Sequence, residues 1–115
     1  MRIALARLDS TVGDIAGNAR AIADSAAALA AGGADLVVLP ELALCGYPPR
    51  DLLQRDGFVQ ACEDTAERLA RDLAGRGAGG VAVLVGLPMR AEGARAHRAR
   101  TPWRSCAAAV SRGAT

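Results

Sequence analysis

The apolar and polar stretches along the first three quarters of the chain predict five secondary-structure elements. Short apolar runs with β-branched residues are typical of strands buried between other layers, and apolar residues recurring every three or four positions indicate helices with one buried face. The predicted strands cover residues 3–8, 35–39 and 81–88, and the predicted helices cover 19–31 and 58–73. A helix in each connection favours parallel strands, so we expect an α/β fold.

Both predicted helices have sequence signals of their ends and faces. Asn18 is expected to be the N-cap of helix 19–31, and the glycines at 32–33 are expected to end that helix. In helix 58–73 the apolar residues form one stripe, and the opposite face is charged. The stripe consists of Phe58, Cys62, Ala66, Leu69 and Leu73.

The strand at 35–39 runs directly into a carboxylate. Pro40 cannot donate to a sheet ladder, so the chain should leave the sheet there and carry Glu41 to the carboxyl edge, where open α/β folds place their chemistry. An acid in this position is more often a surface or capping residue than a functional one. The Gly-Tyr-Pro-Pro segment at 46–49 favours Glu41 as a functional residue, because two prolines make a rigid turn beside the carboxylate.

Composition divides the chain into two parts. Length allows one small domain, and all 14 basic residues are Arg, with no Lys anywhere in the sequence. Residues 1–89 carry 8 Arg and 11 acidic residues, a formal charge of −3, whereas residues 90–115 carry 6 Arg and one acid, a formal charge of +5. The apolar pattern ends after residue 89, so 90–115 is interpreted as an Arg-rich irregular tail in which only 106–110 is strand-like.

Several classes of function are disfavoured by what the sequence contains. The three cysteines, Cys45, Cys62 and Cys106, lack C-x-x-C spacing, which argues against a metal site or disulfide framework and fits a reducing cytoplasm. No apolar run is long enough to span a membrane, and we expect no membrane partner. The tail has Trp103 as its only aromatic residue, so a solvated segment is favoured over nucleic-acid binding, and His97 is expected to be solvated as well.

Several motifs in order resemble one known family. Leu-Pro-Glu-Leu at 39–42, preceded by Gly-Ala-Asp-Leu-Val-Val, resembles the general-base segment of the carbon-nitrogen hydrolase (nitrilase) superfamily. Cys-Gly-Tyr-Pro-Pro-Arg-Asp-Leu-Leu at 45–53 is similar to the glutamine amidotransferase part of glutamine-dependent NAD synthetases, as are residues 8–18 and 83–86. The resemblance runs from residue 2 to about residue 88.

The resemblance implies a partial carbon-nitrogen hydrolase domain at 1–89, the N-terminal portion of a four-layer αββα sandwich. It implies hydrolysis of the glutamine amide by a Glu-Lys-Cys site, with Glu41 as general base and Tyr47 beside the substrate. The ammonia would pass to a synthetase domain encoded downstream, which uses ATP and Mg²⁺; the amidase step itself needs no cofactor. The intact family member is expected to be a homo-oligomer.

The chain departs from this family in its remaining catalytic residues. It contains no Lys, and neither Cys45 nor Cys106 stands in the family's nucleophile context. Cys45 lies four residues after Glu41, but a cysteine is an ordinary filler at that loop position. We therefore expect this chain alone to be inactive. A stand-alone hydrolase of another amide or nitrile, and a non-catalytic binding fragment, remain as alternatives.

A shifted reading frame is one explanation for the tail. Where the family continues with an apolar strand and a Gly turn, residues 101–111 read Thr-Pro-Trp-Arg-Ser-Cys-Ala-Ala-Ala-Val-Ser. With GC-rich codons, moving the frame back by one base can give such a strand and turn. The hypothesis places a frameshift between about residues 89 and 100.

Overall fold

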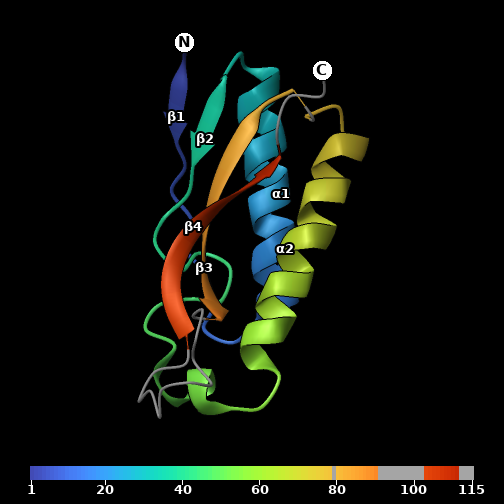
Figure 1. The fold of residues 1–115 in the computed structure, drawn as a ribbon. Coiled ribbons are helices and arrows are strands. Elements are labelled where there is room, and N and C mark those ends of the chain that lie inside the picture. The colour runs from blue at the N-terminus through green and yellow to red at the C-terminus, as the bar shows by residue number, and fades with distance from the viewer. Residues whose placement is uncertain (79, 91–102, 112–115) are drawn as a thin grey trace.

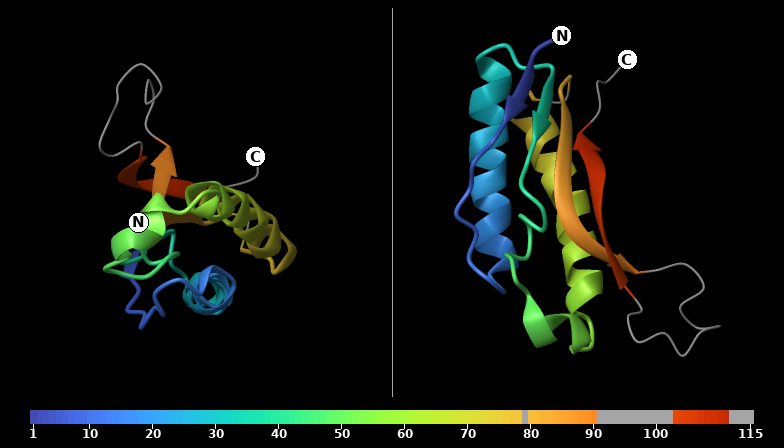
Figure 2. Two further views of the ribbon diagram at one scale, coloured as in Figure 1. Left: turned by 90° about the horizontal axis from the view of Figure 1, so that it is seen from below. Right: turned by 90° about the vertical axis from the view of Figure 1, so that its left-hand side faces the viewer.

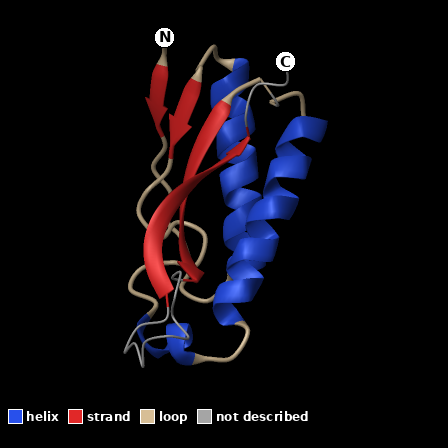
Figure 3. Cartoon of the chain, in the orientation of Figure 1, coloured by secondary structure: helices blue, strands red, loops and turns tan. Residues whose placement is uncertain are grey.

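The chain folds into one sheet with two long helices against it (Figure 1). The structure, a computed structural model, describes residues 1–78, 80–90 and 103–111. Helices and strands alternate through the first three strands, as the sequence predicts (Figure 3). The elements are β1 (Ile3–Leu5), α1 (Ile15–Ala31), β2 (Leu36–Val38), the 3-10 helix η1 (Arg50–Gln54), α2 (Phe58–Gly75), β3 (Ala82–Arg90) and β4 (Trp103–Ser111).

The four strands form a sheet in the order β1-β2-β3-β4. β1, β2 and β3 are parallel, which confirms the prediction from the helical connections. β4 runs antiparallel to β3, with Val85 opposite Ala108. The sequence pattern marks only 106–110 of the tail as strand-like, but β4 covers Trp103–Ser111, so this part of the tail is not irregular. Backbone pairing along β3 extends a strand that the apolar pattern alone does not reveal.

Helix α1 starts earlier than predicted because a different residue caps it. Asp14 is the N-cap, and its Oδ1 accepts a hydrogen bond of 3.0 Å from the backbone N–H of Gly17. The prediction that Asn18 caps this helix is therefore wrong; Asn18 lies inside α1 and is buried. The helix ends at Gly32, as predicted.

The core lies between the sheet and the two helices, which cover the same face of the sheet (Figure 2). The predicted stripe of α2 is confirmed: all of its residues except the partly buried Phe58 are buried. Side chains alternate along the strands, so Val37 of β2 and Val83 and Val85 of β3 point into this core. From α1, Ile22 and Ala26 fill the same space.

The opposite face of the sheet is apolar but largely uncovered in the described structure. Ile3 and Leu5 of β1 are 58% and 76% exposed, so the expectation that the first strand is buried is wrong. The strand at 35–39 was expected to be buried on both faces, yet Leu36 and Val38 are only half-buried. Both deviations have one cause: α1 and α2 lie against one face, and no described helix or strand covers the other face along β1 and β2. We call this other face the open face.

Candidate functional site

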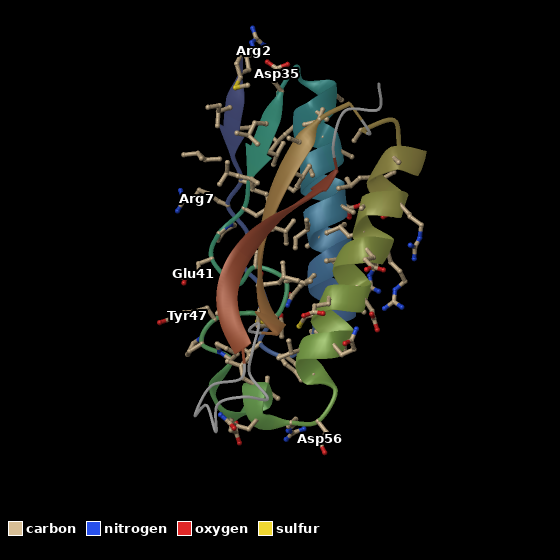
Figure 4. The ribbon with its side chains drawn as sticks, viewed as in Figure 1. Arg2, Arg7, Asp35, Glu41, Tyr47 and Asp56 are labelled. Carbon is tan, nitrogen blue, oxygen red and sulfur yellow. The ribbon has the colours of Figure 1, made fainter. Side chains whose placement is uncertain are left out.

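Glu41 lies where the carboxyl ends of the parallel strands meet. It follows the end of β2 by three residues, after Leu39, whose backbone N–H still donates to Leu84 of β3 over 3.0 Å. The side chain is exposed and makes no hydrogen bond or ion pair with any residue that the structure describes. Figure 4 shows it projecting from the side of the sheet that faces away from the helices. A carboxylate free of internal partners at this edge can accept a proton from an incoming group.

Tyr47 lies on the same side of the molecule as Glu41 (Figure 4). Its side chain is 69% exposed, and the Tyr47–Pro48 peptide bond is cis. The next residue, Pro49, is buried. The structure thus brings the two residues predicted for the site to one loop and to the same side of the molecule.

The backbone of the loop between Pro40 and Pro49 changes direction at Leu42, so that Glu41 is exposed while the residues directly after it are buried. Leu42 has φ of 52°, in the left-handed region that a branched side chain rarely adopts, and it is buried while Glu41 is exposed. Gly86 of β3 lies directly beneath: a Cβ there would be 2.5 Å from the Leu42 nitrogen and 2.9 Å from the Pro40 oxygen. The loop can approach the sheet this closely only because residue 86 is Gly.

A second loop, which follows β1, holds the Glu41 loop from the other side. The Ser10 hydroxyl donates to the Ala43 carbonyl over 2.7 Å, and the Gly13 backbone N–H donates to the Cys45 carbonyl over 2.9 Å. Gly46 has φ of 84°, and a Cβ on it would lie 2.6 Å from Cα of Val12. These contacts fix the underside of the loop. The sequence signal that could have found them is the turn-rich segment at 11–18.

Cys45 belongs to this underside and not to the exposed site. Its thiol is fully buried and donates to the Gly46 carbonyl over 3.4 Å. The Cys45 thiol also forms a hydrogen bond with the thiol of Cys62 from α2. This hydrogen bond, together with burial, raises the pKa of Cys62. Both thiols are free, and the structure gives Cys45 a packing role, in line with the filler interpretation. Of the other residues weighed from sequence, the side chain of Cys106 and all of His97 lie outside the described part.

Two other kinds of site are absent from the described residues. Among the described residues, no group of three or more His, Cys, Asp or Glu side chains could hold a metal ion. None of the helices there is both long and apolar enough to cross a bilayer. Glu41 and Tyr47 therefore remain the candidate site residues in this part of the chain.

Comparison with known proteins identifies the family. The carbon-nitrogen hydrolase family model matches residues 2–104. The chain belongs to the carbon-nitrogen hydrolase family. The match extends beyond residue 88, where the recognisable motifs end, and into the first residues of β4.

Relatives within this family are glutamine-dependent NAD synthetases and amidases. The glutamine-dependent NAD(+) synthetase of Synechocystis sp. is 48% identical over 84 residues, which are 73% of this chain and 14% of that protein. The structure of such a synthetase from Cytophaga hutchinsonii matches with a TM-score of 0.80 at 25% identity, covering 98% of this chain and 17% of that one. An amidase from Nesterenkonia sp. matches with a TM-score of 0.62 at 33% identity, covering 76% and 32%.

These matches confirm the expected fold class and the expected relatives. The chain has the α/β fold of carbon-nitrogen hydrolases and forms only part of such a domain. It spans about one seventh of the length of the Synechocystis relative. The sheet and its helix layer correspond to the beginning of the four-layer sandwich that the sequence motifs imply, which explains why the open face is apolar and uncovered.

Proposed function

We propose that this chain is the general-base portion of the amidase half of a glutamine-dependent NAD synthetase. The observation that carries the proposal is the placement of Glu41: exposed, without internal partners, at the carboxyl edge of the parallel strands and on the open face. The synthetase relatives support glutamine as the substrate.

In this proposal Glu41 moves protons for a cysteine nucleophile that lies outside the chain. The carboxylate takes the thiol proton as sulfur attacks the amide carbon of glutamine, and it then gives that proton to the departing ammonia. Water cleaves the resulting thioester, and a Lys, also outside the chain, stabilises the oxyanion. Tyr47 lines the same face and helps to enclose the substrate.

The rest of the reaction belongs to the remainder of the protein. This chain contains no Lys, and Cys45 is buried away from the exposed face. It is therefore expected to release no ammonia from glutamine on its own. ATP and Mg²⁺ are used by the synthetase domain that receives the ammonia, and the intact protein is proposed to be a cytoplasmic homo-oligomer.

A chimera tests the proposal without the missing segments. Residues 1–88 of this chain would replace the matching segment of the Synechocystis synthetase, to which the chain is 48% identical over 84 residues. The expected result is ammonia release from glutamine, measured with purified chimera, while the unfused chain gives none. A folded chimera that leaves glutamine intact would count against the proposal.

The second candidate is a stand-alone hydrolase acting on another amide or nitrile. The Nesterenkonia amidase, 33% identical over 76% of this chain, keeps this candidate open, although the Synechocystis synthetase is more similar, at 48% identity over 73% of the chain. The segment at 45–53 favours the synthetase instead. A synthetase domain encoded downstream would exclude the stand-alone hydrolase.

The nucleotide sequence beyond codon 89 also tests the frameshift and the non-catalytic alternative. If codons 101–111 encode the apolar strand in the other frame, the frameshift between about residues 89 and 100, real or from sequencing, is supported. If they do not, the frameshift hypothesis fails. A fragment that persists with a binding role would then become the better explanation for a chain without Lys.

A further inference from the structure

Asn18 is a buried polar side chain whose position the helix itself does not require. It is only 4% exposed, and Thr65 of α2 is the other buried polar residue among those described. Asp14 already caps α1, so the amide of Asn18 is free for other partners. Its sequence position suggests a cap, but its contacts are with two loops.

The Asn18 amide joins the loop after β1 to the loop that carries Glu41. Its Oδ1 accepts from the backbone N–H of Thr11 over 2.9 Å. Its Nδ2 donates to the carbonyl of Thr11 over 2.8 Å and to the carbonyl of Leu44 over 3.0 Å. All three hydrogen bonds are made to backbone groups of the protein. The partner nearest to Glu41 in the sequence is Leu44, three residues after it. A buried amide group with every partner satisfied specifies one arrangement of the segments that it joins.

The Glu41 loop depends on such outside partners. Two backbone hydrogen bonds lie within it, from Ala43 to Pro40 and from Gly46 to Leu42, and they close only local turns. Leu42 adopts an unfavourable left-handed conformation between them. A conformation of this kind persists only where the surrounding structure determines it. Asn18 supplies one such contact, to Leu44, two residues after Leu42.

We propose that Asn18 is a positioning residue for Glu41: its amide ties α1 and the loop after β1 to the Leu44 carbonyl and so helps to fix the direction of the carboxylate. This inference rests on the proposed function only in taking Glu41 as the general base; the tie between Asn18 and the loop rests on the hydrogen bonds alone. The residue type follows from the contacts, because one acceptor and two donors on a short side chain are a combination that Asn provides. Asp at this place would face two carbonyl oxygens with no proton to donate.

Hydrogen exchange of the full chain tests the positioning directly. The variants are Asn18→Asp, which keeps the acceptor and loses both donors, and Asn18→Ala, which loses all three bonds. In both, the backbone amides of Leu44, Gly46 and Gly13 are expected to exchange at least about tenfold faster, since the loop opens locally. The sheet amides of Ala6 and Leu39, which donate across the strands, are expected to keep their rates.

Thr65→Ala is the matched control, because Thr65 is the other buried polar residue among those described and its hydroxyl accepts a hydrogen bond from Arg68 within α2. It should leave the relative rates of loop and sheet amides unchanged. Unchanged loop rates in both Asn18 variants would overturn the inference. Equal acceleration at every amide would also overturn it, because Asn18 would then support the whole fold and not the loop.

A second readout separates positioning from the proposed function. In the chimera described above, Asn18→Asp should lower kcat for glutamine by about 100-fold with KM changed little, as expected when a reacting group is misplaced by about 1 Å. If the chimera itself is inactive, the proposed function fails while the exchange result still decides the role of Asn18. Full activity of the Asn18→Asp chimera would contradict the positioning role.

Discussion

The two faces of the sheet have similar side chains and opposite surroundings. On the covered face, Val37 and Val83 are fully buried against α1 and α2. On the open face, Ile3 and Leu5 are mostly exposed although they are just as apolar. A sheet that is apolar on both faces is typically covered by another layer of structure on each face. The difference shows that this chain completes one interface of its fold and leaves the other to further layers.

The Glu41 loop repeats this contrast on a smaller scale. Leu42, Leu44 and Cys45 are buried on its underside, while Glu41 and Tyr47 are exposed. The covered side therefore fixes the loop, and the open side leaves the carboxylate exposed. A general base needs both properties, a fixed position and access to the group that it deprotonates.

The largest expected effect comes from removing a side chain on the covered face. Leu87 of β3 is buried, and Leu87→Ala should lower the free energy of unfolding by about 2–5 kcal/mol, since it leaves a cavity. Ile3→Ala on the open face should change it by less than about 0.5 kcal/mol. Denaturant unfolding of both variants measures the contrast. Equal losses would show that the two faces are covered alike.

Gly86→Ala is expected to have the next largest effect on the free energy of unfolding. The added Cβ would meet backbone atoms of Leu42 and Pro40, which cannot move aside as a flexible side chain does. We expect a loss of about 1–3 kcal/mol in unfolding free energy, with faster hydrogen exchange at Leu44. The control is Gly75→Ala at the end of α2, where a Cβ would meet nothing within 4 Å. It should be neutral or stabilising by up to about 1 kcal/mol, and the account fails if the two variants behave alike.

The smallest effect on stability is expected on the open face. Leu5→Glu should change the free energy of unfolding by less than about 0.5 kcal/mol, because Leu5 is mostly exposed. It should nevertheless reduce self-association, since it interrupts an exposed apolar surface. Sedimentation velocity measures the change against Arg71→Gln, which alters the net charge by the same amount at an exposed position of α2, away from that face. A large loss of stability would mean that Leu5 is covered.

Much of the covered face could be predicted from the sequence. The period of the apolar residues in α2 identifies its buried stripe, and the short runs around Val37 and Val83 identify parallel strands. Glu41 could be placed at the carboxyl edge because Pro40 ends the pairing of β2. These features depend on local pattern, which the sequence displays directly.

The remaining features depend on contacts between distant segments. Asn18 is a residue type that is preferred at the N-cap of a helix, yet Asp14 is the N-cap of α1. The amide of Asn18 donates a hydrogen bond to the Leu44 carbonyl instead. The exposure of Leu5 follows from which layers are present and not from its own sequence neighbours. Pairing with β3 likewise makes a strand of Trp103–Ser111, where local pattern marks only its middle.

The most direct test of the central claim is glutamine turnover by the chimera with and without Glu41→Gln. If Glu41 is the general base, the substitution should lower kcat by about 10²–10⁴-fold, because the amide cannot accept the thiol proton. Asp56→Asn, an exposed acid in the turn before α2 and away from Glu41 in Figure 4, should leave kcat unchanged. An active chimera whose kcat is unaffected by Glu41→Gln would contradict the account.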